Sequence, residues 1–417
     1  MLQAMYNGVS AIVADQQDMN VIGNNIANVS TTAYKSSNVT FADQLSQTLQ
    51  GASAGNNSVG GTNPAQVGTG VKIASIQPDE SQGGLTATST PTDLAIQGNG
   101  YFLLSNPDYG TSYTRDGHFA IDSKGGLVDA TTGEYVLGWQ ADASGKIDTN
   151  QAPGDINIGI GTDTVVKPTD AVTMAGNVNS TDAGGATEST QITVDDSLGE
   201  AHTITVTLTR QTSGGNPTNV WDWSASGDSG LTTPTGTTNQ GTITFGTNGQ
   251  VTAATGSLQL NPTDGSASPQ DVTMNFNAMT QVDSDTSMAM SSQDGYPSGT
   301  LESYSIDPTG VITGTFSNGL TQSLGQIAMA NFSNPQGLDS IGNNEFTPTP
   351  NSGAAIVGTP NTLGLGTVSS GYLEESNVDL GTEFTNMIVA QNAYDANTKI
   401  VSTVNQMLQT LVQMVQG

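Results

Sequence analysis

Apolar residues recur every three or four positions at both ends of the chain, the spacing of one face of an α-helix. The first stripe consists of Leu2, Met5, Val9, Ile12, Met19 and Ile26. The second consists of Leu380, Phe384, Met387, Tyr394, Val401, Leu408, Val412 and Val415. Polar Gln391, Thr398 and Asn405 interrupt the second stripe at heptad positions where polar groups set register and partner choice. We therefore predict a coiled-coil-like helix at each end of the chain.

Between the two ends the pattern predicts β-structure. Asp-Gly and Gly-Gly turns, such as Asp116-Gly117 and Gly125-Gly126, separate short apolar segments about every ten residues. A similar texture returns in the segment 301–332, whereas 151–287 is richer in Thr and alternates more strictly. This order predicts two nested antiparallel β domains, stacked outward from terminal helices that pair at one end. The expected fold class is α+β, mostly β.

These patterns divide the chain into four expected parts. A Gly- and Asn-rich stretch over 51–70 shows no apolar periodicity and is typical of an extended linker or loop. The parts are a terminal helical domain (1–30 with 372–417), an extended linker region (31–71 with 361–371), an inner β domain (72–150 with 288–360) and an inserted outer β domain (151–287).

Composition excludes several functions. The chain of 417 residues has 8 Lys+Arg and 37 Asp+Glu, a net charge of −29, and no basic patch, which argues against nucleic-acid binding. It has no cysteine and two histidines, so we expect no thiolate or multi-histidine metal site and no cofactor. No window approaches the ~20 apolar residues of a membrane span, and no Sec-type signal peptide is visible at the start.

Candidate catalytic features are weak. The adjacent carboxylates Asp195-Asp196 and Glu374-Glu375 are more typical of solvated turns or caps than of a glycosidase pair. His118 follows an Asp-Gly turn and His202 begins a strand, where hydrogen-bonding and capping roles are expected. Trp221 and Trp223 share one strand face and offer either a sugar-stacking platform or, more commonly, core packing. We expect no enzyme activity.

Several segments resemble the signatures of bacterial flagellar rod and hook proteins. They are MNVIGNNIAN at 19–28, TAYKS at 32–36, NGYF at 99–102, YTRDGHF at 113–119, LGQIAMANF at 324–332 and SNVDL at 376–380. The terminal signatures include Gly23, Asn24, Asn25, Ala27, Asn28, Asn377, Val378 and Asp379. The insertion and the segment GYPSG at 295–299 resemble hook rather than rod proteins.

The resemblance implies a structural subunit of the flagellar hook. This is an extracellular helical homopolymer that transmits torque from rod to filament as a flexible universal joint and conducts exported subunits. It further implies export through the flagellar type III apparatus without a cleaved signal peptide, and contacts with the distal rod, the hook cap and the hook–filament junction protein. Two alternatives stay open: a distal-rod-like axial subunit, and a secreted carbohydrate-binding β protein.

The helical stripes agree with a self-assembling subunit. A single helix with a narrow apolar stripe is marginal in water, so we expect the stripes to drive self-assembly. The opposite face of the last helix carries Asn392, Gln406, Gln409, Gln413 and Gln416, and residues 396–417 hold only one charged side chain, Lys399. An uncharged polar face of this kind suits a channel that binds passing chains weakly, so we expect these residues to line it.

Overall fold

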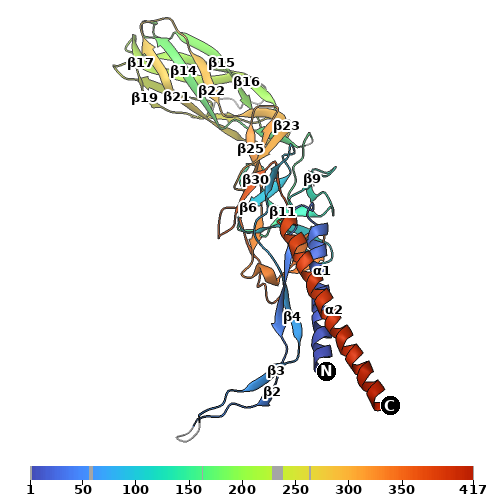
Figure 1. Ribbon diagram of the computed structural model, residues 1–417. Helices are drawn as coiled ribbons and strands as arrows, with labels where there is room; N and C mark the ends of the chain where they lie inside the picture. The colour runs from blue at the N-terminus through green and yellow to red at the C-terminus, as the bar shows by residue number, and fades with distance from the viewer. Residues whose placement is uncertain (1, 56–59, 162, 228–237, 263, 417) are drawn as a thin grey trace. The chain divides into compact units, whose positions relative to one another are not determined.

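The computed structural model describes residues 2–55, 60–161, 163–227, 238–262 and 264–416, and forms two compact units. Unit 1 comprises Met1–Ile158, Ser305–Thr313 and Ser323–Gly417. Unit 2 comprises Gly159–Tyr304 and Gly314–Gln322. The prediction of a mostly β fold with paired terminal helices is confirmed, since the helices lie side by side and strands make up most of the rest (Figure 1).

The helices α1 (Leu2–Ala27) and α2 (Leu380–Gln416) run antiparallel within unit 1. Asn397 Nδ2 donates a hydrogen bond to Asp15 Oδ2 at 2.8 Å. Gly8 lies so close to α2 that an added Cβ would come within 2.9 Å of Val401 Cγ2. At the N-terminus of α2, Asp379 Oδ1 accepts a hydrogen bond from the amide of Thr382 at 3.0 Å, which caps the helix.

A long hairpin lies beside α1. Strands β1 (Ser37–Asp43) and β4 (Val71–Pro78) pair antiparallel, and β2 (Ser46–Gln50) pairs with β3 (Ala65–Gly68) farther along. The amide of Val71 donates to Ser10 Oγ of α1 at 3.3 Å. The stretch expected as a linker or loop over 51–70 therefore contains β3, whose pairing with β2 supplies the regularity that its Gly- and Asn-rich sequence does not show.

The β core of unit 1 is built around aromatic edge-to-face contacts. Phe332 lies 5.8 Å from Tyr101 and 4.9 Å from Tyr113, measured between ring centroids. The remaining elements of this unit are β5 (Leu85–Ala87), β6 (Leu94–Gln97), β7 (Tyr101–Asn106), β8 (Gly110–Thr114), β9 (Phe119–Ile121), β10 (Leu127–Asp129), β11 (Tyr135–Gln140), β12 (Gly154–Asp155), β26 (Met329–Asn331), η1 (Pro335–Gly337), β27 (Asp339–Gly342), β28 (Glu345–Thr347), β29 (Ile356–Gly358), β30 (Thr367–Ser370) and β31 (Tyr372–Glu374).

Unit 2 contains a four-stranded and a five-stranded sheet around one apolar core. Its strands are β13 (Thr164–Lys167), β14 (Ala171–Asn179), β15 (Thr187–Asp195), β16 (Ala201–Ser213), β17 (Asn216–Gly227), β18 (Gln240–Phe245), β19 (Val251–Ala254), β20 (Leu258–Leu260), β21 (Gln270–Val282) and β22 (Ala289–Gln293). Three further strands, β23 (Tyr296–Ile306), β24 (Val311–Phe316) and β25 (Thr321–Ile327), belong to the segments where the chain passes between the units.

The pairing of β14 with β21 departs from the expected antiparallel pattern. Strands β14 and β21 are parallel, from Ala171 opposite Thr273 to Asn179 opposite Val282. A parallel pair needs a long crossover connection, and here the chain between them forms the five-stranded sheet β15–β19 before it returns. The alternating Thr-rich pattern predicts strands but carries no information on their direction.

Candidate functional site at the base of the terminal helices

A buried ion-pair cluster lies where the terminal segments meet the β core of unit 1. Lys35 Nζ lies 2.6 Å from Glu374 Oε1, and Arg115 Nη1 lies 3.2 Å from Glu374 Oε2. The three side chains are at most 5% exposed. The amide of Gly83 also donates to Glu374 Oε1 at 3.0 Å, so hydrogen bonds complete the shell that a buried carboxylate needs. Loss of either cation would leave a buried negative charge poorly compensated.

The local backbone explains how Lys35 reaches this cluster. After α1 the chain turns, and Ala33 adopts a φ of 56°, a left-handed conformation that is rare for a residue with a Cβ. The amide of Ala33 donates to the carbonyl oxygen of Glu374 at 2.8 Å, and Ala33 is 2% exposed. This contact fixes the turn against β31 and places Lys35 over the Glu374 carboxylate.

Two asparagines of the terminal signatures tie the helices to the hairpin. Asn25 Oδ1 accepts from the Ser37 amide and Asn25 Nδ2 donates to the Ser37 carbonyl oxygen, both at 2.9 Å. The same Nδ2 lies 3.2 Å from Glu383 Oε1 of α2. Asn377 Oδ1 accepts from the Ser36 amide at 2.7 Å, while its Nδ2 donates to the Asp79 carbonyl oxygen at 2.8 Å. These amides satisfy both a donor and an acceptor, which a carboxylate or an apolar side chain would not do.

The other signature residues have smaller roles in the single chain. Asn28 Nδ2 donates to the carbonyl oxygen of Asn24 at 2.9 Å, and Asn24 Nδ2 donates to the Tyr34 hydroxyl at 3.1 Å, so both shape the end of α1. An added Cβ at Gly23 would meet no atom within 4 Å. Of the remaining signature positions, Ala27 is exposed, Val378 is half-buried, and Asp379 is the cap of α2.

Glu383 is a second buried carboxylate near this cluster. It is 6% exposed, and its Oε2 has no hydrogen-bond partner among the described residues. Burial raises the pKa of Glu383, the hydrogen bond from Asn25 lowers it, and the nearby Asp18 and Asp379 raise it further. A buried carboxyl group without a cation partner is costly, so this position is electrostatically incomplete in the single chain.

The helix pair buries only part of the predicted apolar stripes. Half-buried positions are Met5, Ile12, Met19, Ile26, Met387, Tyr394, Val401 and Leu408. Exposed positions are Leu2, Val9, Leu380, Phe384 and Val412, from 40% to 59%. The side chain of Val415 lies outside the described part of the structure. Each helix therefore retains apolar surface that its partner helix in the same chain does not cover.

The sequence pattern missed several residues of the contact between the helices. The positions of α2 that join Met387, Tyr394, Val401 and Leu408 in the heptad are Glu383, Ala390, Asn397 and Val404, not the predicted 384, 391, 398 and 405. The small residues Gly8, Ala14 and Ala390 are buried at this contact or beside it. Small side chains permit close approach of two helices but add little to the apolar pattern of the sequence. The prediction therefore assigned the more apolar Phe384 to the stripe.

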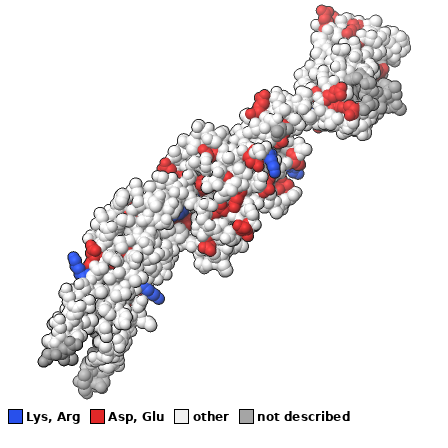
Figure 2. Space-filling view, turned by 90° about the vertical axis from the view of Figure 1, so that its right-hand side faces the viewer, with Lys and Arg blue, Asp and Glu red and all other residues white. Residues whose placement is uncertain are grey.

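The expected channel-lining residues lie on the exposed polar face of α2. Asn392, Gln406, Gln409 and Gln413 are exposed, and the Gln416 side chain lies outside the described part of the structure. Figure 2 shows that most of the viewed surface is free of charged groups and that Lys and Arg are sparse on it.

Trp221 and Trp223 pack in the core of unit 2, which confirms the prediction favoured over a sugar-stacking platform. Trp221 and Trp223 are 0% and 1% exposed, and Trp223 packs against Phe276 with ring centroids 5.6 Å apart. Buried rings in the core of unit 2 present no face to a sugar.

The adjacent carboxylates were expected to be solvated turn or cap residues, and the expected exposure to solvent is wrong at three positions. Glu374 lies in the ion-pair cluster, and Asp195 and Asp196 are 2% and 0% exposed. Asp196 accepts hydrogen bonds from the amides of Leu198 and Glu200, which stabilise a turn and help to lower its pKa to about 2 despite burial. Only Glu375 is exposed, as expected.

Both histidines pair with carboxylates. His118 Nδ1 lies 2.9 Å from Asp93 Oδ1, in agreement with a hydrogen-bonding role. His202 is the second residue of β16, and its Nε2 lies 3.2 Å from Asp196 Oδ2.

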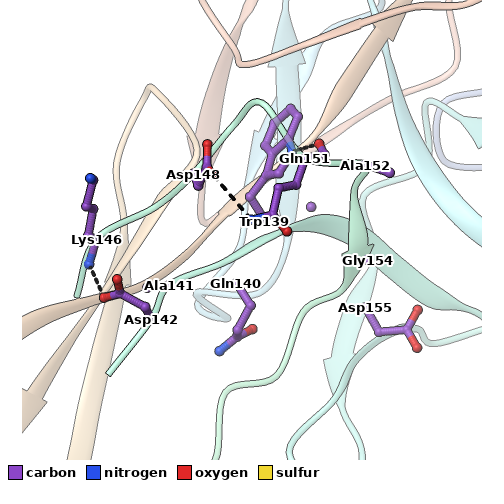
Figure 3. Close-up of a pocket in the computed structure, with 11 residues that line it drawn as sticks. Trp139, Gln140, Ala141, Asp142, Lys146, Asp148, Gln151, Ala152, Gly154 and Asp155 are labelled. Carbon is purple, nitrogen blue, oxygen red and sulfur yellow. Dashed lines mark hydrogen bonds between the residues drawn. The ribbon is translucent and has the colours of Figure 1, made fainter. Parts of the chain in front are cut away.

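A polar cavity of about 430 Å³ lies beside β11 (Figure 3). Trp139 Nε1 donates to the carbonyl oxygen of Gln151 at 2.8 Å, and Gln151 Nε2 donates to Asp148 Oδ2 at 3.2 Å. Asp142 accepts from the Ser144 hydroxyl and from the Lys146 amide. These hydrogen bonds lower the pKa of Asp142 and that of Asp148, so both groups are ionised at neutral pH. They therefore stabilise turns and are poorly suited to donate a catalytic proton.

No described helix is long and apolar enough to span a membrane. Family models match four parts of the chain: "Flagella basal body rod protein" at residues 5–35, "Flagellar hook protein FlgE/F/G D1 domain" at 95–209, "Flagellar basal body protein FlaE D2 domain" at 162–296, and "Flagellar basal body rod FlgEFG protein C-terminal" at 369–414.

The chain is 36% identical to the flagellar hook protein FlgE of Treponema pallidum, covering 99% of this chain and 100% of that protein. It is 35% identical to FlgE of Escherichia coli, again covering 99% and 100%. The chain belongs to the flagellar hook protein family. The flagellar basal-body rod protein FlgG of Bacillus subtilis is 29% identical, covering 99% of each chain. These two hook proteins match at higher identity than this rod protein does.

Family membership establishes the general role of the chain. It is a structural subunit of the flagellar hook, part of the flagellum, and a member of a family of self-polymerising proteins rather than of enzymes.

Proposed function

We propose that the polymer of this chain is a flexible universal joint, with the terminal helices as its inner tube and the β units outside them. The buried cluster of Lys35, Arg115 and Glu374 carries this proposal. It joins the segment after α1, the segment before α2 and the β core of unit 1 through ion pairs inside a water-excluded site. A force on the helices is therefore transmitted to the β core through short, fixed contacts.

The exposed apolar side chains of both helices supply the driving force for assembly. On α1 these are Leu2, Tyr6, Val9 and Val13, and on α2 they include Phe384, Ile388, Ile400, Met407, Leu411 and Val412. Burial of each large side chain against another copy contributes ~1.5–3 kcal/mol before ordering costs. We propose that the predicted stripes Leu2, Met5, Val9, Ile12, Met19, Ile26, Leu380, Phe384, Met387, Tyr394, Val401, Leu408, Val412 and Val415 divide between contacts within one copy and contacts between copies.

The polar face of α2 is proposed to line a channel for exported subunits. Its members are Asn392, Gln406, Gln409, Gln413 and Gln416. Amide side chains exchange hydrogen bonds with water at little net cost, so an unfolded chain would pass them without strong binding.

The finer setting is also a proposal. We propose an extracellular polymer that contacts the distal rod, the hook cap and the hook–filament junction protein after delivery by the flagellar export apparatus. We further propose four parts along the chain: 1–30 with 372–417, 31–71 with 361–371, 72–150 with 288–360, and 151–287.

Negative-stain microscopy of the full chain under polymerising salt tests this function. A flexible joint predicts curved tubes. Straight, rigid tubes would favour a distal-rod-like subunit, and a folded monomer that never assembles would contradict the proposal.

A further inference from the structure

A cavity of about 240 Å³ lies between α1, β1 and α2 in unit 1. Its apolar lining comes from Ile22, Val39, Phe41 and Val389, and its acidic lining from Asp18 and Glu383. The apolar part has room for one aliphatic side chain. The two carboxylates add negative charge at the same place.

The cavity lacks a positive partner. The described residues include no ion pair to Asp18 or Glu383, and Glu383 Oε2 has no hydrogen bond. Burial raises the pKa of Asp18, and the neighbouring Asp15 raises it further. Burial likewise raises the pKa of Glu383. A cation placed here would relieve the unfavourable burial of negative charge.

The hairpin contains a second exposed surface, which we define as the hairpin arm: residues 44–50 and 65–72. Its apolar side chains Leu45, Leu49 and Val67 are 87%, 67% and 42% exposed. Strands β2 and β3 form an isolated two-stranded sheet with exposed residues throughout. A two-stranded hairpin with uncovered apolar groups is marginally stable in water, so the arm needs a covering surface.

The arm also has a cation near its apolar anchor. Lys72 is exposed and stands opposite Ala42 in the β1–β4 ladder, next to the pair Asp43 and Val71. The Thr69 hydroxyl donates to the carbonyl oxygen of Leu45, which holds the two sides of the arm together. An aliphatic group and an ammonium group thus lie on the same short stretch of the hairpin.

We propose that the hairpin arm of one copy docks into the cavity of a second copy, with Leu45 against the apolar lining and Lys72 facing Asp18 and Glu383. The inference rests on the proposed self-assembly and names the surfaces that meet. Apolar surface meets apolar surface, and a cation meets two unpaired carboxylates.

Lys72 of the hairpin arm does not point toward the cavity of its own copy. Along β4, half-buried Val71 and Ile73 alternate with exposed Lys72 and Ala74. Because successive strand residues point to opposite faces, Lys72 points away from the face on which Val71 and Ile73 are partly covered. Lys399, the cation of α2, lies on the polar face of that helix, which is proposed to line the channel. Lys72 is therefore the better candidate for the cation that faces Asp18 and Glu383.

The absence of cysteine allows a direct test by disulfide mapping. A Leu45→Cys chain is mixed with an Asn386→Cys chain under polymerising salt and then oxidised; Asn386 is exposed and lines the cavity. Each chain carries one cysteine, so any disulfide between the two variants joins two copies. We expect mixed dimers on a non-reducing gel. A mixture of Leu198→Cys with Asn386→Cys is the matched control and should give few, since Leu198 is an exposed leucine of unit 2.

The outcomes separate this inference from the proposed function. Tubes without dimers between positions 45 and 386 overturn the docking and leave self-assembly intact. Dimers without tubes support the docking and contradict the tube. The absence of both tubes and mixed dimers would contradict the docking and the proposed tube alike.

Charge reversal tests the ionic contact. Lys72→Glu should raise the protein concentration needed for assembly about tenfold, because it places a carboxylate against two others. Asp18→Lys in the same chain should restore most of the loss. Lys124→Glu reverses an exposed charge in a turn outside the arm and should have little effect. Equal effects of Lys72→Glu and Lys124→Glu would overturn the contact.

Discussion

Lys35 and Glu374 are 339 positions apart in the chain, yet Lys35 Nζ lies 2.6 Å from Glu374 Oε1 in a site closed to water. Arg115 holds the other carboxylate oxygen. Two of the eight Lys and Arg residues, Lys35 and Arg115, therefore meet at this one glutamate. This cluster joins the segments next to both terminal helices to the β core of unit 1, beside the pairings of β30 with β6 and of β31 with β5.

Lys35→Met is expected to destabilise unit 1 strongly. It removes one partner of a buried pair and leaves Glu374 with incomplete compensation, at a cost of about 3–5 kcal/mol. Urea unfolding followed by circular dichroism measures the change. Lys124→Met, at an exposed turn position, is the control and should change stability by less than about 0.5 kcal/mol. Equal midpoints for the two variants would contradict the structural role of the cluster.

Glu134 is expected to make the stability of unit 1 depend on pH. Burial and the nearby Glu345 raise its pKa from 4.5 to about 7, and Asn106 Nδ2 lies 2.7 Å from Glu134 Oε1 and 3.3 Å from Glu345 Oε2. The folded chain therefore holds this proton more tightly than the unfolded chain. Its stabilising effect is full below pH 4.5 and is lost as the pH rises toward 7.

Glu134→Gln should flatten this dependence, because the amide does not titrate. Unfolding midpoints in urea at pH 5 and pH 7.5 measure it, with the exposed Glu302→Gln of β23 as the control. A parent chain that becomes more stable between pH 5 and pH 7.5, with the gain absent from Glu134→Gln, would contradict the predicted loss of stability with rising pH.

Trp223→Ala should destabilise unit 2 and leave assembly intact. The ring is 1% exposed, so its removal leaves a cavity that costs about 3–5 kcal/mol. Calorimetry should show one transition that moves to lower temperature and another that stays. Loss of tubes in conditions where unit 2 remains folded would contradict the assignment of assembly to the terminal helices.

Local periodicity was sufficient to predict the two helices and the β character between them. The helix stripes follow a 3.6-residue repeat and the turns are marked by Asp-Gly and Gly-Gly, so both are visible without tertiary information. The choice of contact face was not predictable in this way. Gly8 packs against Val401, and Glu383 takes a position between the helices while Phe384 stays exposed. Small residues occupy this contact because the close approach of two helix backbones favours small side chains. Glu383 is accommodated there by its hydrogen bond with Asn25.

The chemistry of the candidate site was only partly visible. Asn25 and Asn377 were identified by their resemblance to terminal signatures, but their exchange of hydrogen bonds with the Ser36-Ser37 backbone needed the structure. Glu374 was expected in solvent because adjacent glutamates usually are. One sequence signal could have indicated a buried glutamate. Lys35 and Arg115 lie within the segments TAYKS and YTRDGHF, and a buried lysine or arginine requires a carboxylate partner.

Sedimentation and negative-stain microscopy of a Phe384→Asn, Ile388→Asn double variant test whether the exposed apolar side chains of α2 drive assembly. These side chains are 53% and 59% exposed and lie one turn apart on α2, so their replacement removes apolar surface without disturbing the contact with α1. The matched control is Leu198→Asn with Ile160→Asn, which replaces exposed apolar residues of unit 2. We expect tubes from the parent chain and from the control, and a folded, soluble α2 variant that forms no tubes. Normal tubes from the α2 variant would contradict the role of α2 in assembly.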